Sequence, residues 1–121
     1  MILRINGTLE IAHNLPNYEG KCKKLHGHRI EYIVSFEGDI HEDGMVEDFK
    51  VLDKIIQIVA DRFDHTYLND FLENPTLELF AKYFLNDLNK EYGRIKNRKR
   101  GKFVKLEMWE TSKYGVVVGN G

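Results

Sequence analysis

Polar and apolar residues alternate along two long segments in the first third of the chain. In residues 2–13 the odd positions are mostly apolar and end at His13, whereas positions 4, 6, 8 and 10 are Arg, Asn, Thr and Glu. In residues 25–37 the even positions begin with His26 and His28 and continue as apolar residues up to Phe36. A period of two is typical of a β-strand with one buried face. The pattern therefore predicts two strands, over residues 2–13 and 25–37.

Two segments in the middle of the chain follow the helical period instead. One apolar stripe follows Asp48, whose side chain can cap the first turn of a helix. A second stripe follows Asn74-Pro75, which we interpret as the cap and first residue of another helix, and Gly93 is placed to end it. The stripes consist of Leu52, Ile55, Ile56, Val59 and Phe63, and of Leu77, Phe80, Ala81, Phe84, Leu85 and Leu88.

Alternation returns in the last part of the chain. Residues 114–118 read as a short final strand, and residues 103–110 read as a longer one. The order strand, strand, helix, helix, strand, strand predicts an α+β fold with the order ββααββ. We find no repeat or linker, so residues 1–121 are interpreted as one domain. The longer strand would place Val104, Leu106, Met108 and Glu110 on one face, and Phe103, Lys105, Glu107 and Trp109 on the other.

Three histidines lie at one end of the apolar faces of the two N-terminal strands: His13 at the end of the first, and His26 and His28 at the start of the second. If these strands pair antiparallel, His13 faces His26 and His28. Neighbouring buried imidazoles need partners for their ring nitrogens, and one metal ion accepts several lone pairs at once. Three histidines with an open fourth position are the ligand set of a catalytic zinc ion. The alternative is that backbone carbonyl groups satisfy each histidine separately.

Glu110 ends the apolar face of the strand over residues 103–110 in the same way. A carboxylate in a buried position needs a partner. A ligand with two adjacent N–H donors fits, because a carboxylate accepts both in a bidentate fork. Alternatively, the strand ends at Met108 and Glu110 is solvated in a turn.

Two further groups could move protons. Cys22 precedes His26 by four residues and can therefore lie over the open metal position. A nearby cation lowers the pKa of a thiol and makes it a base or nucleophile; otherwise Cys22 is an inert buried thiol. Asp64 could orient the adjacent His65 for proton transfer, although such a pair is also common at the C-terminal end of a helix.

The composition limits the classes of function. The chain of 121 residues is 42% hydrophobic and 31% charged, as in a globular domain. Its net charge of -1 gives no general attraction to nucleic acid or membranes. A single cysteine excludes an internal disulfide and suits a reducing compartment. We see no signal peptide and no apolar stretch of membrane-spanning length, so we expect a cytoplasmic protein without a membrane partner.

One run of like charge stands out, between Arg94 and Lys102. We interpret it as a solvated loop and, second, as a region that steers an anionic substrate towards the site. RNA phosphates could also bind such a run. No aromatic residues interleave with the basic ones, so we expect no nucleic-acid partner.

The motifs taken together resemble those of the 6-pyruvoyltetrahydropterin synthase family, in order over nearly the whole chain. The spacing of Cys22 and His26 is similar to that of the 6-carboxytetrahydropterin synthase branch, which makes a precursor of queuosine and archaeosine. The matching motifs are Ile11-Ala12-His13, Cys22-Lys23-Lys24-Leu25-His26-Gly27-His28, Gly44-Met45-Val46 with Asp48-Phe49, Asp64-His65 with Leu68-Asn69, Pro75-Thr76-Leu77-Glu78 and Glu110-Thr111.

This resemblance implies a tunnelling fold, in which an antiparallel four-stranded sheet carries two helices on one face. It also implies a homohexamer of two trimers, with active sites between subunits. The implied substrate is the pterin 7,8-dihydroneopterin triphosphate. The implied reaction is a zinc-dependent cleavage to 6-carboxytetrahydropterin, acetaldehyde and triphosphate. The alternative is elimination of triphosphate to give the 6-pyruvoyl product.

The resemblance also implies a role for each candidate residue. The zinc ligands are His13, His26 and His28; the proton-transfer residues are Cys22, Asp64 and His65; and the pterin contacts are Glu110, with Thr76 and Glu78. A hypothesis of a different class is a non-catalytic zinc-containing binding module. The joint presence of the proton-transfer residues and Glu110 favours an enzyme, because a binding module has no use for that set.

Overall fold

The computed structural model describes residues 1–21 and 24–119 of the 121-residue chain. Its sheet has five strands in the order β3-β1-β2-β4-β5. The two longest strands, β1 (Ile2–His13) and β2 (His26–Gly38), pair antiparallel along their whole length. Strand β4 (Gly101–Trp109) pairs antiparallel with β2, and β5 (Gly115–Gly119) pairs antiparallel with β4.

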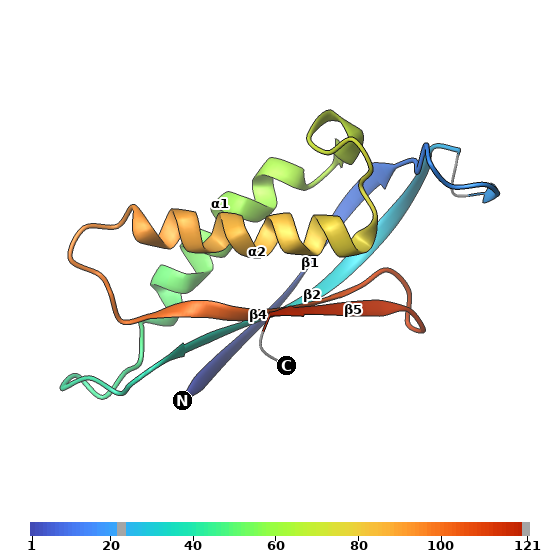
Figure 1. The fold of residues 1–121 in the computed structure, drawn as a ribbon. Helices are drawn as coiled ribbons and strands as arrows, with labels where there is room; N and C mark the ends of the chain where they lie inside the picture. Colours follow the sequence, from blue (N-terminus) through green and yellow to red (C-terminus); the bar gives the residue numbers. More distant parts are fainter. Residues whose placement is uncertain (22–23, 120–121) are drawn as a thin grey trace.

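Two helices lie on one face of this sheet (Figure 1). They are α1 (Phe49–Phe63), which the Asp48 side chain caps, and α2 (Leu77–Gly93). Alternate residues of β1, β2 and β4 point towards the helices and form one core with the helical apolar stripes. The α+β class, the antiparallel pairing of the long strands and the placement of both helices on one face are thus confirmed.

The strand count and the order of elements differ from the expectation of four strands in the order ββααββ. Between the helices, Thr66–Tyr67 form a two-residue strand, β3, that pairs parallel with Ile11 and Ala12 of β1. A 3₁₀ helix, η2 (Leu68–Asp70), follows it. Two residues are too few to show a period, which is why the alternation of residue types did not predict this strand.

The start of α2 also differs from the prediction. Thr76, rather than Asn74, is the cap, because its side-chain oxygen accepts a hydrogen bond from the Leu79 amide at 3.2 Å. Pro75 therefore lies before the helix and not in its first turn. This leaves the Pro75 carbonyl group free to meet another partner, which matters for the site described below.

Strand β4 departs from the predicted alternation at Val104. The register between β2 and β4 shifts at Ser35 and Phe36, where Lys105 and Phe103 become consecutive partners. The resulting bulge at Val104 turns Phe103 into the core, against Phe36 and Tyr92. Phe103 was predicted on the opposite face, because a regular period of two takes no account of an inserted residue.

A buried carboxylate organises the end of the sheet where β2 finishes and β4 begins. The Glu47 side chain accepts hydrogen bonds from the Tyr92 hydroxyl at 2.8 Å and from Arg98 Nε at 3.1 Å. Arg100 forms two hydrogen bonds with Asp43 in the same region. The guanidinium groups of Arg98 and Arg100 are therefore engaged within the fold. Residues 94–100 form the loop that was expected, whereas Lys102 lies in β4.

No helix in the part of the chain that the structure describes is both long and apolar enough to cross a membrane.

Candidate metal centre

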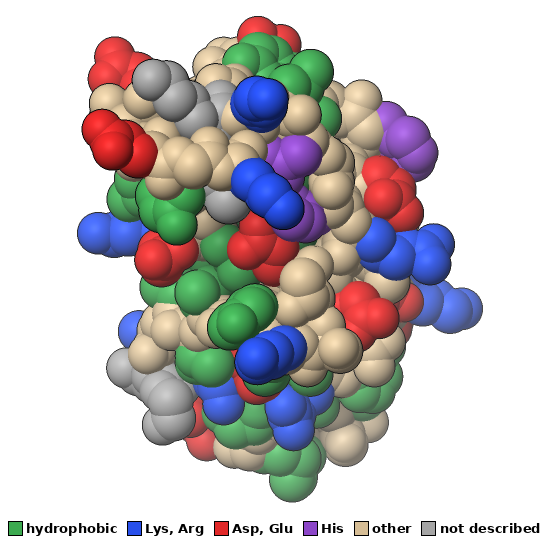
Figure 2. Space-filling view, turned by 90° about the vertical axis from the view of Figure 1, so that its right-hand side faces the viewer, with side chains coloured by type: hydrophobic (Ala, Val, Ile, Leu, Met, Phe, Trp, Pro, Cys, Tyr) green, Lys and Arg blue, Asp and Glu red, His purple; other side chains and the backbone are tan. Residues whose placement is uncertain are grey.

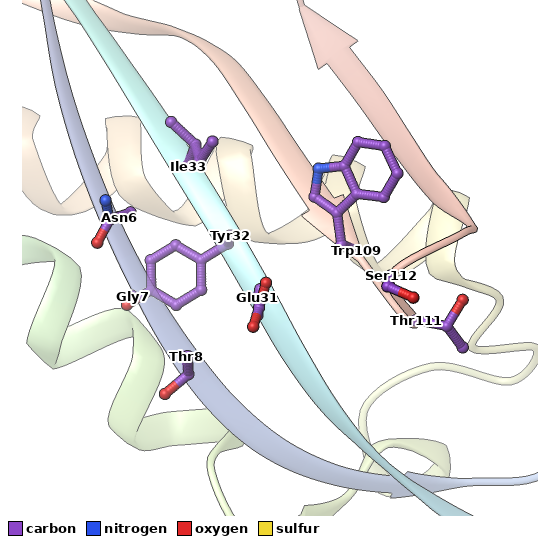
Figure 3. A pocket seen from close by; sticks show the side chains of 9 residues that line it. All are labelled: Asn6, Gly7, Thr8, Glu31, Tyr32, Ile33, Trp109, Thr111 and Ser112. Atoms are coloured by element: carbon purple, nitrogen blue, oxygen red, sulfur yellow. The ribbon is translucent and has the colours of Figure 1, made fainter.

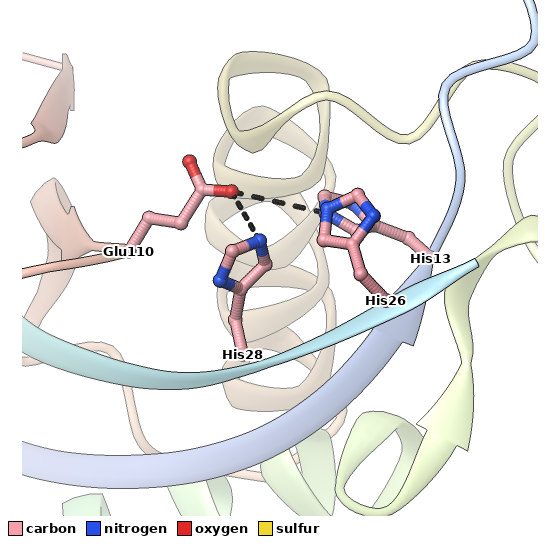
Figure 4. A group of neighbouring side chains, drawn as sticks. All are labelled: His13, His26, His28 and Glu110. Carbon is pink, nitrogen blue, oxygen red and sulfur yellow. Dashed lines mark ion pairs between the residues drawn. The ribbon is translucent and has the colours of Figure 1, made fainter. Parts of the chain in front are cut away.

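Three histidine rings meet at one end of the first hairpin (Figure 4). His13 is the last residue of β1 and lies opposite His26, the first residue of β2. His28 follows two positions later and so points to the same face. The ring centroids lie 4.5 to 5.2 Å apart. The structure thus brings together the three histidines that the sequence pattern predicted to face one another.

Backbone carbonyl groups fix the orientation of two of these rings. His13 Nδ1 donates a hydrogen bond to the Pro75 carbonyl oxygen at 2.8 Å, and His26 Nδ1 donates one to the Lys24 carbonyl oxygen at 2.8 Å. A proton on Nδ1 leaves the lone pair of Nε2 free in a neutral imidazole. The Nε2 atoms of His13, His26 and His28 are all buried and have no hydrogen-bond partner.

The surroundings of His13 and His28 favour the neutral form of these two rings. Burial lowers the pKa of His13 below its usual value, although the hydrogen bond to Pro75 opposes this shift. Burial also lowers the pKa of His28, against the nearby charge of Glu110, which raises it. Protonated imidazoles would repel one another and could not coordinate a cation. The neutral form that burial favours is the form that binds metals.

Glu110 completes the group from the other side. It follows the last residue of β4, and its Oε1 atom lies 2.6 Å from His28 Nε2 and 3.8 Å from His13 Nε2. Its side chain is 26% exposed. Of the two readings left open for Glu110, the strand does end before this residue, but its carboxylate points into the histidine cluster.

These four side chains have the composition of a metal site. One ligand atom from each residue can be chosen so that all four lie within 4.8 Å of one another. Unpaired buried polar atoms are costly, and an ion at their centre would satisfy all three Nε2 atoms. The His28 and Glu110 side chains are 21% and 26% exposed, so the cluster is accessible from solvent on one side. Figure 2 shows histidine side chains beside an acidic group on one face of the molecule. The residues present therefore fit a metal ion.

A second group of contacts holds the His13 end of β1 in place. The Asn69 side chain accepts a hydrogen bond from the Asn14 amide at 3.0 Å and donates one to the Asn14 carbonyl oxygen at 2.9 Å. The Tyr67 hydroxyl donates to the Asn14 side chain. The segment of β3 and η2 is thus fastened directly beside His13. Sequence reasoning named Asn69 only as part of a motif and missed this contact.

Asp64 and His65 lie outside the cluster. The Asp64 side chain accepts a hydrogen bond from the Glu10 amide at 2.7 Å, and its Oδ1 atom lies 3.2 Å from His65 Nδ1. The hydrogen bond from Glu10 is the main reason that the pKa of Asp64 is lowered. The His65 side chain is 76% exposed, and its backbone has a φ of 58°, a left-handed conformation that is uncommon for residues other than glycine.

The remaining predicted site residues have varied positions. Thr76 caps α2 and lies directly after Pro75, the hydrogen-bond partner of His13. Glu78 lies exposed in the first turn of α2, where its charge complements the helix dipole. Cys22 lies outside the described residues. Contact of Cys22, Thr76 and Glu78 with a substrate stays a prediction.

The basic segment lies far from the histidines within one chain. The histidines are at the start of β2, whereas Gly38, at its end, pairs with Gly101, directly after the segment. A strand of 13 residues spans roughly 40 Å. Steering by residues 94–102 towards the metal centre of the same chain is therefore not supported.

A separate hollow of about 590 Å³ opens on the sheet face that the helices leave free (Figure 3). Polar side chains of Asn6, Thr8 and Glu31 line it, together with Ile33 and Trp109. This face also carries the ion pairs Arg4–Glu107 and Arg29–Glu10. This face carries polar, charged and apolar side chains, and it lies on the opposite side of the sheet from the core.

Comparison with known proteins agrees with the geometry. Residues 2–120 match the model of a family described as 6-pyruvoyl tetrahydropterin synthase. A Synechocystis sp. protein named 6-carboxy-5,6,7,8-tetrahydropterin synthase is 40% identical over 95 residues, which cover 67% of this chain and 69% of that protein. A Pyrococcus furiosus protein named dihydroneopterin monophosphate aldolase is 34% identical over 110 residues, which cover 90% of this chain and 89% of that protein.

A solved structure supports the same fold. The 6-pyruvoyl tetrahydropterin synthase of Caenorhabditis elegans superposes with a TM-score of 0.85 and 24% sequence identity. The match covers 100% of this chain and 96% of the other. The two-layer arrangement of helices on a sheet is therefore shared over the whole length.

Proposed function

This chain belongs to the 6-pyruvoyl tetrahydropterin synthase family, and we propose that it is a cytoplasmic, zinc-dependent lyase. The proposed reaction converts 7,8-dihydroneopterin triphosphate to 6-carboxy-5,6,7,8-tetrahydropterin and releases acetaldehyde and triphosphate. The observation that carries this proposal is the convergence of three buried, unpartnered Nε2 atoms on one point. The name of the Synechocystis relative supports the choice of product.

In this proposal His13, His26 and His28 hold the zinc ion through their Nε2 atoms. When bound, zinc supplies a Lewis acid that polarises the oxygen atoms of the substrate side chain and lowers the pKa of the neighbouring C–H group. Pro75 and Lys24 keep two of the rings in the required tautomer by accepting their Nδ1 protons.

Proton transfer is assigned to Cys22 on one side of the substrate and to His65 on the other. Asp64 accepts the Glu10 amide proton and lies beside His65 Nδ1, which suits it to orient the ring. The exposed His65 lies outside the histidine cluster of its own chain. We therefore assign it to an active site that a neighbouring subunit completes, as the family resemblance implies.

Glu110 is assigned to the pterin ring. A carboxylate can accept two parallel hydrogen bonds from the adjacent N–H groups of the pterin edge. Thr76 and Glu78 are the further candidates for the pterin, since α2 begins beside His13.

Two alternative reactions have their own support. Elimination of triphosphate to the 6-pyruvoyl product is the reaction after which the family is named. Aldol cleavage of a dihydroneopterin phosphate, to a 6-hydroxymethylpterin, is suggested by the Pyrococcus furiosus relative, whose alignment covers 90% of this chain. A non-catalytic zinc-containing module is the remaining alternative.

One experiment separates these functions. The zinc-loaded protein would be incubated with dihydroneopterin triphosphate and, separately, with dihydroneopterin monophosphate, and the products identified by mass spectrometry. We expect 6-carboxytetrahydropterin and acetaldehyde from the triphosphate. A pyruvoyl or hydroxymethyl product would establish the corresponding alternative, and absence of product would favour the binding module.

His13→Ala serves as the inactive control, because it removes one of three metal ligands. His41→Ala is its matched counterpart, since His41 is exposed and lies at the other end of β2. We expect product from His41→Ala and none from His13→Ala.

A further inference from the structure

The position of Glu110 leads to an inference that rests on the proposed function and extends it. We propose that the Glu110 carboxylate is the fourth ligand of the metal when no pterin is bound. We further propose that pterin binding draws it away and so opens the fourth metal position.

The first argument is geometric. Glu110 Oε1 approaches the Nε2 atoms of both His28 and His13, and these are the atoms that face the centre of the cluster (Figure 4). The 2.6 Å approach to His28 does not have the geometry of a hydrogen bond, since His28 Nε2 has no hydrogen-bond partner. The oxygen therefore lies among the ligand atoms rather than at the end of an N–H vector.

The second argument concerns charge. A neutral imidazole with its lone pair aimed at the cluster would repel a carboxylate oxygen, unless a cation lies between them. Three imidazoles and one carboxylate form an ordinary four-ligand set for Zn²⁺.

The third argument concerns movement. Glu110 belongs to the turn between β4 and β5, whose backbone is held by the hydrogen bond from the Glu110 amide to the Tyr114 carbonyl oxygen at 3.0 Å. Its side chain is partly exposed and can rotate about its own bonds while the turn stays in place. Four protein ligands close a zinc site, and a catalytic site needs an open position. The pterin edge, with two N–H donors, offers the carboxylate an alternative partner.

Cobalt(II) substitution tests this exchange without turnover. Its visible absorption depends on the number and type of ligands, and a competing chelator gives its affinity. For Glu110→Gln we expect an altered spectrum and a loss of metal affinity of roughly tenfold or more. The matched control is Glu107→Gln, because Glu107 lies three residues earlier, on β4, but pairs with Arg4 on the open face. We expect the control to match the wild type.

Neopterin, which has the pterin ring and no phosphate, provides the second measurement. Adding it to the cobalt protein should change the wild-type spectrum, and should leave the spectrum of Glu110→Gln close to its starting form. An unchanged spectrum and affinity in Glu110→Gln would overturn the inference, because Glu110 would then contact the pterin alone. The product assay above is separate: a protein that exchanges this ligand but forms no carboxypterin would refute the proposed function and leave the inference standing.

Discussion

At the scale of single residues, the positions of the imidazole protons define the metal centre. Hydrogen bonds to two carbonyl groups place protons on Nδ1 of His13 and His26, and burial keeps His13 and His28 neutral. The free lone pairs therefore point inwards before any ion arrives. Such preorganisation reduces the cost of ordering the ligands when a metal binds.

Cys22 gives a prediction that separates the thiol from the metal. If Cys22 is the base and not a ligand, Cys22→Ala should retain one zinc ion per chain and lose a factor of roughly 100 or more in turnover. Elemental analysis and a steady-state assay would measure the two effects. Loss of zinc from this variant would instead place the thiol among the metal ligands.

Glu47 gives a prediction about stability and pH. Burial would raise the pKa of Glu47, but hydrogen bonds from Tyr92, the Asp48 amide and Arg98 outweigh burial and lower it. A lowered pKa in the folded state stabilises the protein above the unfolded value of about 4.3, and this stabilisation is lost as pH falls through the folded value.

Glu47→Gln should therefore lower the free energy of unfolding by about 2–4 kcal/mol at pH 7, and by less at pH 3. Urea denaturation of the metal-free proteins at both values would measure this difference. Glu42→Gln is the control, since Glu42 is exposed. An equal loss at both pH values would contradict the role assigned to the Glu47 charge.

At the scale of elements, the segment from Asp64 to Asp70, which includes β3 and η2, acts as a brace for β1. Asp64 binds the Glu10 amide, Thr66 and Tyr67 pair with Ile11 and Ala12, and Asn69 binds both polar groups of the Asn14 backbone. The brace spans the last residues of β1, including the one that carries the His13 ring. It therefore supports the strand end that carries this metal ligand from the edge of the sheet.

Asn69→Ala tests this brace. It removes two hydrogen bonds to the residue after His13, and should destabilise the protein by about 1–2 kcal/mol and weaken zinc binding by roughly tenfold. Chelator competition would measure the affinity, with Asn86→Ala, an exposed residue of α2, as control. Unchanged zinc affinity in Asn69→Ala would show that β1 positions His13 without help.

The elements also show how much of the structure the pattern of residue types predicts. The long strands and both helices follow from regular periods, and His13, His26, His28 and Glu110 could be found because each places a polar group where burial is expected. The brace could not be found, since its backbone pairing with β1 covers only two residues, and Asp64 and Asn69 add side-chain hydrogen bonds that no local pattern records. The bulge at Val104 and the Thr76 cap depend on tertiary packing that no local pattern records.

At the scale of the whole molecule, the sheet has two open edges. Only the end of β1 is covered by β3, so residues 2–9 have no further strand on their outer side among the residues described, and β5 is the last strand at the opposite edge. Open edges favour pairing with another chain. They support the proposal, implied by the family resemblance, that this protein assembles into a homohexamer of two trimers.

Thr8→Pro tests this assembly. The amide and carbonyl groups of Glu10 bind Asp64 and His65 on the outer side of β1, so those of Thr8, two residues earlier, also point outwards. Proline at position 8 removes an outward donor and leaves the pairing with β2 intact. We expect light scattering to show a hexamer for the wild type and for Thr8→Val, and a smaller species for Thr8→Pro. A wild-type monomer with full activity would refute the assembly.

The pairing of His13 with His26 has a further consequence, for how the chain folds. A hairpin slipped by one residue would turn His26 and His28 to the face away from His13. A slip of two residues would keep the face but displace His13 by roughly 7 Å along its partner. Neither misaligned hairpin offers all three imidazoles to one ion. A metal ion that binds while the hairpin forms would therefore stabilise the native alignment of β1 with β2 over both misaligned hairpins.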